Sequence, residues 1–188
     1  MARYPVPELE SLPDDIKAQV DAVAEKAGFI PNVFLGMAHR PAEFRAFFAY
    51  YDALMDRDGN LTKAEKEMIV VATSATNECL YCVVSHGAFL RIYAKDPLLG
   101  DQVAVNYRKA PISDRQKAML DFAVKVAQFS QDVVEEDFQE LHAHGFDDED
   151  IWDITAITGL FALSNRMANV TGMQPNDEFY TMGRSPRS

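Results

Sequence analysis

The sequence predicts an all-α protein. Apolar residues recur every three or four positions along most of the chain, which is the period of a helix with one buried face. Capping residues precede several of these segments, and no alternating strand pattern bounded by turns occurs. With 48% hydrophobic and 25% charged residues among 188, the composition is that of a globular chain. We expect one helical domain over residues 1–182 and a flexible tail at 183–188.

The first part of the domain, residues 12–57, should hold the N-terminal helices. An amphipathic pattern that begins at Ile16 ends at Gly28, a residue suited to the left-handed turn after a helix. Pro41 suits the first turn of the next helix, and a turn signal at 58–60 ends it. This helix carries an aromatic stripe expected in the core or in a subunit interface, formed by Phe44, Phe47, Phe48 and Tyr51.

The central part, residues 61–95, should be a pair of helices. Thr62 and Glu65 have the spacing of a capping box, so a helix should begin there and continue through the apolar run that follows. That run is apolar on nearly all sides and should be buried. The next helix should carry Cys79 in its first turn and end near Ala94.

The last part, residues 112–172, is predicted from the same signals. Ser113 begins a second capping box, and a short helix should close at Gly145. Asp147 should open a long final helix that ends near Gly172. All three parts should pack as one helical bundle.

The two capping boxes lie 51 residues apart, from Thr62 to Ser113. This indicates either a degenerate internal two-fold repeat or simply two capped helices that look alike. If the repeat is real, its second copy has lost the side chains that carry chemistry in the first: Ala118, Ser130, Val133 and Asp137 stand in the places of Glu67, Cys79, Cys82 and His86.

Charge and composition exclude several classes of function. The formal net charge is −11, so the chain should repel nucleic acid and anionic lipid surfaces. The first ten residues lack the apolar core of a signal peptide, and nowhere do 18 apolar residues run together. We expect a cytoplasmic protein without a membrane span. Its two cysteines cannot form a disulfide framework for a domain of this size.

The cysteines instead form a local motif with a histidine. Cys79, Cys82 and His86 are spaced at i, i+3 and i+7, so they share one face of a helix. Free N–H groups and the helix dipole at the first turn favour a thiolate there. One helical turn separates the cysteine Cα atoms by roughly 5 Å, which a disulfide can span. The spacing predicts a pair that opens and closes reversibly.

Glu67 is the predicted partner of this motif. It lies in the strongest apolar run of the chain, where a carboxylate is costly unless it is paired. The neighbouring antiparallel helix is the natural place for its partner, and His86 is the nearest candidate. His86 could then take a thiol proton or hold the thiolate as an ion pair, with Glu67 orienting the ring.

Plainer interpretations stay open. The cysteines could be two buried structural thiols, and Glu67 could be an ordinary buried ion-pair partner. Two thiolates, an imidazole and a carboxylate could also hold zinc, although ligands crowded on one helix face make a poor tetrahedron. We otherwise expect neither metal nor cofactor. Asn165 and Arg166 in the final helix are interpreted as an oligomer contact or a structural ion pair.

The pattern Glu-x11-Cys-x2-Cys-x3-His resembles the alkylhydroperoxidase D-like proteins of the carboxymuconolactone decarboxylase-like superfamily, in particular the peroxidase-related branch. Segments 28–34 and 161–166 agree with that resemblance, which covers most of the chain. It implies an all-helical fold, a homo-oligomer, and reduction of hydroperoxides through the cysteine pair by a dithiol or thioredoxin-like reductant. This is peroxiredoxin-type chemistry without a cofactor.

The resemblance also implies roles for the four residues. Cys82 would be the peroxidatic thiol, Cys79 the resolving thiol, and His86 and Glu67 the proton relay. The best-known alkylhydroperoxidases carry a histidine just before the second cysteine, where this chain has Tyr81. The resemblance therefore predicts dithiol–disulfide chemistry more firmly than efficient peroxide reduction.

Two classes of function remain: an enzyme that reduces a peroxide or a disulfide, and a non-catalytic redox sensor or adaptor using the same pair. Lactone decarboxylation is disfavoured because relatives with that activity do not depend on a Cys-x2-Cys pair. The aromatic stripe and the strongly apolar final helix predict an oligomer, since together they exceed what a small helical monomer needs to bury.

Overall fold

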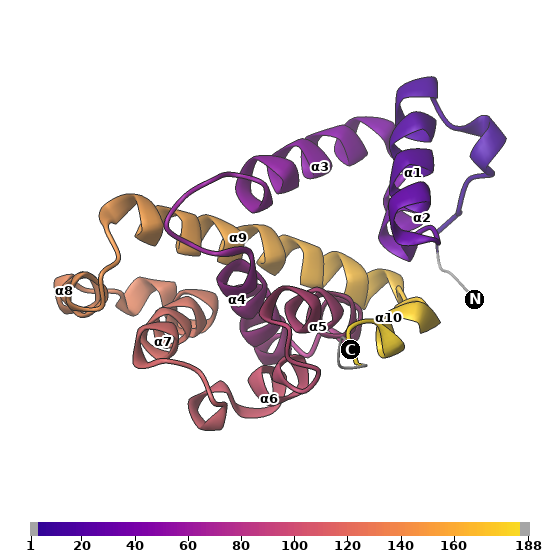
Figure 1. The fold of residues 1–188 in the computed structure, drawn as a ribbon. Coiled ribbons are helices and arrows are strands. Elements are labelled where there is room, and N and C mark those ends of the chain that lie inside the picture. Colours follow the sequence, from indigo (N-terminus) through magenta and orange to yellow (C-terminus); the bar gives the residue numbers. More distant parts are fainter. Residues whose placement is uncertain (1–3, 185–188) are drawn as a thin grey trace.

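The structure is a computed structural model that describes residues 4–184, and over that range it is all-α, as predicted, with no strand (Figure 1). The long helix α9 runs through the molecule, with α1 and α2 at one end, α7 and α8 at the other, and α3 running from α1 back above α9. The helices are α1 (Asp14–Ala27), α2 (Asn32–Met37), α3 (Pro41–Met55), α4 (Lys63–Thr76), α5 (Leu80–Ala94), α6 (Leu99–Asn106), α7 (Asp114–Phe129), α8 (Glu135–Ala143), α9 (Asp148–Thr171) and α10 (Asp177–Thr181).

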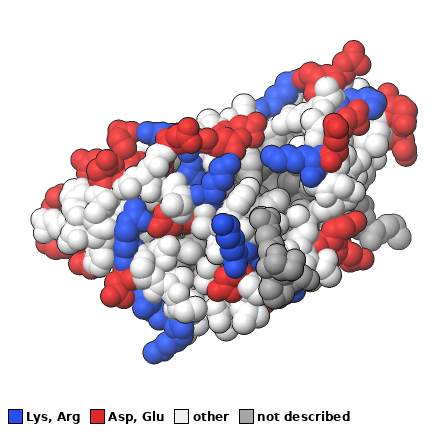
Figure 2. All heavy atoms as spheres, in the orientation of Figure 1, with Lys and Arg blue, Asp and Glu red and all other residues white. Residues whose placement is uncertain are grey.

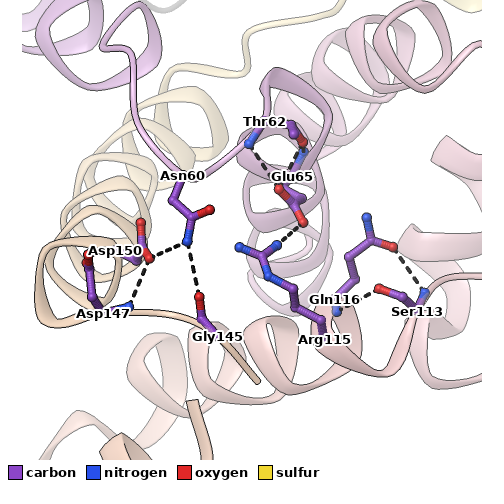
Figure 3. Close-up of polar contacts among 9 residues, drawn as sticks. All are labelled: Asn60, Thr62, Glu65, Ser113, Arg115, Gln116, Gly145, Asp147 and Asp150. Atoms are coloured by element: carbon purple, nitrogen blue, oxygen red, sulfur yellow. Dashed lines mark hydrogen bonds and ion pairs between the residues drawn. The ribbon is translucent and has the colours of Figure 1, made fainter. Parts of the chain in front are cut away.

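The predicted starts of α4, α7 and α9 are confirmed, and each has a capping box. These three helix starts meet in one polar cluster (Figure 3). Glu65, in the capping box of α4, also pairs with Arg115 of α7. Asn60 donates from Nδ2 to the Asp150 carboxylate of α9 at 2.8 Å and to the Gly145 carbonyl at 3.1 Å. The cluster fixes the beginning of α4, four residues before Glu67, against both neighbouring helices.

The interior consists of two main apolar clusters. The larger joins the end of α3 with α4–α7 and α9, and the apolar run of α4 is buried on all sides, as predicted. The smaller cluster belongs to the N-terminal helices, where Phe44 and Phe48 are 0% and 5% exposed. The aromatic stripe of α3 is therefore largely used inside the chain, so this part of the case for an oligomer is wrong. Homo-oligomer formation itself stays a prediction.

Three short helices were not predicted. α2 lies between Gly28 and Pro41, α6 between Ala94 and Ser113, and α10 after Gly172, in segments to which the sequence pattern assigned no helix. The offset of 51 is kept by α4 and α7 but not by the helices that follow them, since α5 begins at Leu80 and α8 at Glu135. The second residue of the predicted tail is anchored, because Arg184 pairs with Asp101 at 2.6 Å. Residues 185–188 of that tail lie outside the described residues.

Acidic side chains gather at two places on the face shown in Figure 2, over α1 and over the start of α9. Ion pairs neutralise some of them, such as the pair of Asp15 with Arg45 at 2.6 Å. In residues 4–184 no helix combines the length and the apolar character that crossing a membrane requires.

Candidate active site

The turn between α4 and α5 places Cys79 at the start of α5. Glu78 has a φ of 51°, in the left-handed region, and this turns the chain so sharply that Cys79 becomes the N-cap residue. The sequence had placed Cys79 inside the first turn. Instead its Sγ accepts the backbone N–H of Cys82 at 3.4 Å. The sulfur thus lies at the positive end of the helix dipole and pairs with one of the N–H groups that the helix leaves free.

Both thiols are free and buried, with Cys79 at 0% and Cys82 at 1% exposure. The pKa of Cys79 is lowered to about 7, chiefly because the Cys82 side chain hydrogen-bonds to it, against the opposing effect of burial. The pKa of Cys82 is raised well above that of an ordinary thiol by the same hydrogen bond and by burial. Near neutral pH the two sulfurs therefore act as one acid–base unit that shares a proton, with the charge resting on Cys79.

Glu67 and His86 form the buried pair that the sequence predicted. Glu67 Oε2 lies 2.7 Å from His86 Nδ1, and the two side chains are 4% and 10% exposed. Three aromatic rings enclose the imidazole, with centroids at 4.7 Å for Phe161, 5.7 Å for Phe89 and 6.4 Å for Tyr51. The carboxylate fixes one ring nitrogen and the orientation of the imidazole, in surroundings that offer it little solvent.

The predicted relay does not reach the sulfurs directly. Among residues 4–184, no hydrogen bond joins the His86 ring to either thiol. The charge of His86 still contributes to the lowered pKa of Cys79, though as a small effect. Because Glu67 engages Nδ1, Nε2 is the ring nitrogen left to exchange a proton. A water molecule or a substrate has to bridge from there to a sulfur.

Two side chains of α9 belong to the site and were missed as such from the sequence. Ser164 Oγ lies 3.7 Å from Cys82 Sγ. Asn165 is fully buried, donates to Ser74 Oγ at 2.9 Å, and accepts from Asn77 Nδ2 at 2.9 Å. Asn165 also favours thiolate on both sulfurs by hydrogen bonding. The interpretation of Asn165 as an oligomer contact or a structural ion pair is wrong, because the side chain is fully buried and its partners are the neutral Ser74 and Asn77. Its position among apolar core residues was the available signal.

Segments far from the motif cover the cysteine pair. Val33 of α2 and Met173, just after α9, pack against the apolar cluster that contains the two cysteines and Tyr81. The Tyr81 hydroxyl accepts the backbone N–H of Val33 at 3.1 Å, which ties α2 to α5. Burial raises the pKa of Tyr81, so its hydroxyl stays neutral. Tyr81 stands where the resemblance led us to compare it with a histidine, and here its hydroxyl is engaged by the backbone of α2.

The ligands required by the zinc alternative are not brought together. In the part of the chain that the structure describes, no three His, Cys, Asp or Glu side chains are grouped as a metal site. Glu67 is hydrogen-bonded to His86, and Cys79 Sγ accepts a backbone N–H at the start of its own helix. The arrangement favours acid–base and thiol chemistry over metal ligation.

The chain matches the model of the Carboxymuconolactone decarboxylase family over residues 41–95. These residues span α3–α5 and include all four residues of the predicted motif. A comparison with curated proteins found no match.

Two solved structures resemble the chain over nearly its whole length. One is a peroxidase-related protein with an alkylhydroperoxidase AhpD core from Ralstonia eutropha JMP134, with 68% identity and a TM-score of 0.98, covering 99% of this chain and 98% of that one. The other is a peroxidase-related protein from Silicibacter sp. TM1040, with 42% identity and a TM-score of 0.92, covering 97% and 96%. The debrominase Bmp8 shares the fold at 17% identity and a TM-score of 0.74, covering 95% and 94%. This chain belongs to the alkylhydroperoxidase D-like proteins of the carboxymuconolactone decarboxylase superfamily.

Proposed function

We propose that the protein is a thiol-dependent peroxidase that reduces hydroperoxides through a Cys79–Cys82 dithiol–disulfide cycle. One observation carries the proposal: two buried thiols share a proton at a helix start, one turn of α5 before a buried Glu67–His86 pair. Burial of four titratable side chains is costly and is typical of a site built for chemistry. The names of the two full-length relatives support the same activity.

The reaction balances with these groups alone plus an external reductant. Thiolate at Cys82 attacks the distal oxygen of the hydroperoxide, the O–O bond breaks, and the alkoxide leaves as alcohol after taking a proton. Cys82 is then a sulfenic acid. Cys79 attacks that sulfur, water leaves, and the disulfide forms. A dithiol donates two electrons and two protons to restore both thiols.

His86 would supply the proton to the leaving alkoxide. Its Nδ1 contacts Glu67, so Nε2 is the nitrogen able to donate, and the substrate itself would bridge from the sulfur to the ring. Glu67 would act through His86 by holding the ring in the orientation that this transfer needs. Cys82 is the sulfur proposed to react first because Ser164, its neighbour at 3.7 Å, also lines the cavity above the pair.

Turnover with a donor separates an enzyme from a redox sensor or adaptor. We expect catalytic consumption of tert-butyl hydroperoxide when dihydrolipoamide or thioredoxin with its reductase is present, and little with glutathione alone, because a dithiol resolves the mixed disulfide internally. Peroxide and donor should disappear in equal amounts. Formation of the disulfide without repeated turnover by any donor would favour the sensor, and turnover of disulfides without peroxide would favour a disulfide reductase.

A further inference from the structure

The reactive thiols are enclosed, so any oxidant must pass a cover. A cavity of about 10 Å³, with room for one water molecule, lies one side chain away from Cys82. Its walls include Ser164, whose Oγ lies 3.7 Å from Cys82 Sγ, and Val33, Tyr81 and Met173, which belong to the apolar cluster around the cysteines. A hydroperoxide larger than water can reach Cys82 only if one of these walls moves.

A larger groove lies on the other side of one wall. It measures about 290 Å³ and runs between residues 4–6, α2 and the end of α9. Met173 lines both the groove and the inner cavity, and no other residue does so. Met173 is therefore the side chain that the outer groove and the inner cavity have in common.

Met173 is suited to move. It is partly exposed and unbranched, and a methionine side chain changes rotamer at little cost. It follows Gly172, whose φ of 70° ends α9, so it stands on a turn rather than inside a helix. On the α2 side it meets Gly36, where a Cβ would lie 2.7 Å from the Met173 Cε. Because Gly36 has no side chain, there is room for the Met173 methyl group beside it.

The groove carries no charged side chain. Its lining is apolar or neutral, with Tyr4, Pro5, Val6 and Leu35 beside the amides of Asn32 and Gln174. The chain as a whole has a net charge of −11. An anion would be repelled by that net charge and would find no cation in the groove. An uncharged molecule with an apolar part would lose little hydration free energy on entering it.

We propose that Met173 is the gate between this groove and the cysteine pair and, resting on the peroxidase function proposed above, that the oxidant it admits is uncharged. Closed, the gate keeps solvent from the thiols. Open, it joins groove and cavity into one path ending at Cys82. Size and charge selection then occur at Met173 and in the groove, away from the residues that react.

Alkylation kinetics test the gate without requiring peroxidase activity. The reduced protein is treated with iodoacetamide and with bulky N-(1-pyrenyl)maleimide, each rate being divided by that of the unfolded chain. Met173→Ala should raise the maleimide rate about tenfold, equivalent to about 1.4 kcal/mol of opening free energy, and the iodoacetamide rate much less. Met173→Leu, which keeps the volume, should stay within about twofold of the wild type.

Two matched variants locate the effect. Leu35→Ala removes side-chain volume from the groove alone, and Met37→Ala removes it from the inner cavity alone. Both should leave the ratio of maleimide to iodoacetamide rates unchanged. If Met37→Ala raises that ratio and Met173→Ala does not, the entry lies elsewhere and the gate is refuted. An unfolding curve for each variant confirms that the change is local.

Gln174→Glu tests the charge of the path with little change of shape. The rate with anionic iodoacetate should fall about threefold at low salt, with the neutral iodoacetamide rate unchanged and the difference shrinking as salt is added. Equal behaviour of the two reagents would show that they do not pass this groove. Neither experiment uses peroxide, so failure of the gate and failure of the peroxidase function are distinguishable. The gate can be present in a protein without peroxidase turnover, and peroxidase turnover can be present without the gate.

Discussion

Cys82→Ser protein should lose peroxide turnover by a factor of at least about 10³, because a serine hydroxyl neither ionises near neutral pH nor forms a disulfide. Cys79→Ser should also stop the cycle, but one step later. It should consume one equivalent of peroxide and hold a sulfenic acid on Cys82, which dimedone and peptide mass spectrometry would locate. A sulfenic acid on Cys79 in the Cys82→Ser protein, with none in Cys79→Ser, would reverse the order of attack.

The pKa values of the two thiols bear directly on which of them attacks the peroxide first. In the resting site the charge lies on Cys79, whose pKa is about 7, and the proton lies on Cys82. Cys82 can attack only after its proton passes to Cys79. In Cys79→Ser the thiolate that raises the Cys82 pKa is gone, so that pKa should fall toward the ordinary thiol range, with burial still opposing.

Replacing Cys82 should raise the pKa of Cys79, whereas replacing Cys79 should lower that of Cys82. Alkylation of Cys79 in the wild type should rise with pH through about 7 and then level off, because the thiolate is the reactive form. Cys82→Ala removes the thiol that donates to Cys79, which is the main cause of its lowered pKa. The midpoint should therefore move to higher pH. An unchanged midpoint would mean that the helix start and Asn165 alone set the acidity of Cys79.

Glu67→Gln should lower turnover by roughly 10² to 10⁴, the range expected when acid–base help is lost. The amide keeps the shape of the carboxylate and can still hydrogen-bond to His86 Nδ1, so the fold should survive. Without the carboxylate, the His86 ring is oriented less firmly toward the leaving alkoxide, so the proton reaches that oxygen less readily. The profile for thiol alkylation should shift to higher pH, because less positive charge then lies beside the thiols.

Glu65→Gln is the matched control for this prediction. Glu65 is buried on the same helix at 4% exposure, but its partners are Arg115 and the capping box of α4. That variant should lose stability and keep its pH–rate profile. If Glu67→Gln and Glu65→Gln behave alike, Glu67 has only a structural role and the relay consists of His86 and the two cysteines.

Local signals were enough to predict the long helices. Capping boxes at Thr62 and Ser113, and Gly28 and Gly172 after helices, depend on residues within one turn of each other. The short helices α2 and α10 have no such signal, since six or five residues cannot sustain a helix alone. Distant contacts hold them: Asn32 with Asn176, and Arg91 with the carbonyls at the end of α10.

In the site too, local sequence signals predicted some residues, whereas others are brought in by distant parts of the chain. Glu67, Cys79, Cys82 and His86 lie on two consecutive helices, so their spacing predicted the Glu67–His86 contact. Asn165, Ser164 and Met173 come from α9 and the turn after it, about 80 or more residues from the cysteines. No local pattern tells which face of a buried helix meets the thiols. The position of Cys79 as N-cap was missed because it follows from the left-handed Glu78, a conformation uncommon for glutamate.

The most direct test of the central claim is a titration of fully reduced protein with one equivalent of tert-butyl hydroperoxide, followed by peptide mass spectrometry without added reductant. One peroxide should be consumed per chain, and the peptide that contains Cys79 and Cys82 should lose two hydrogens as its disulfide forms. Adding a dithiol should restore both thiols. Peroxide consumed while both cysteines remain alkylatable, or no consumption by a folded reduced protein, would contradict that claim.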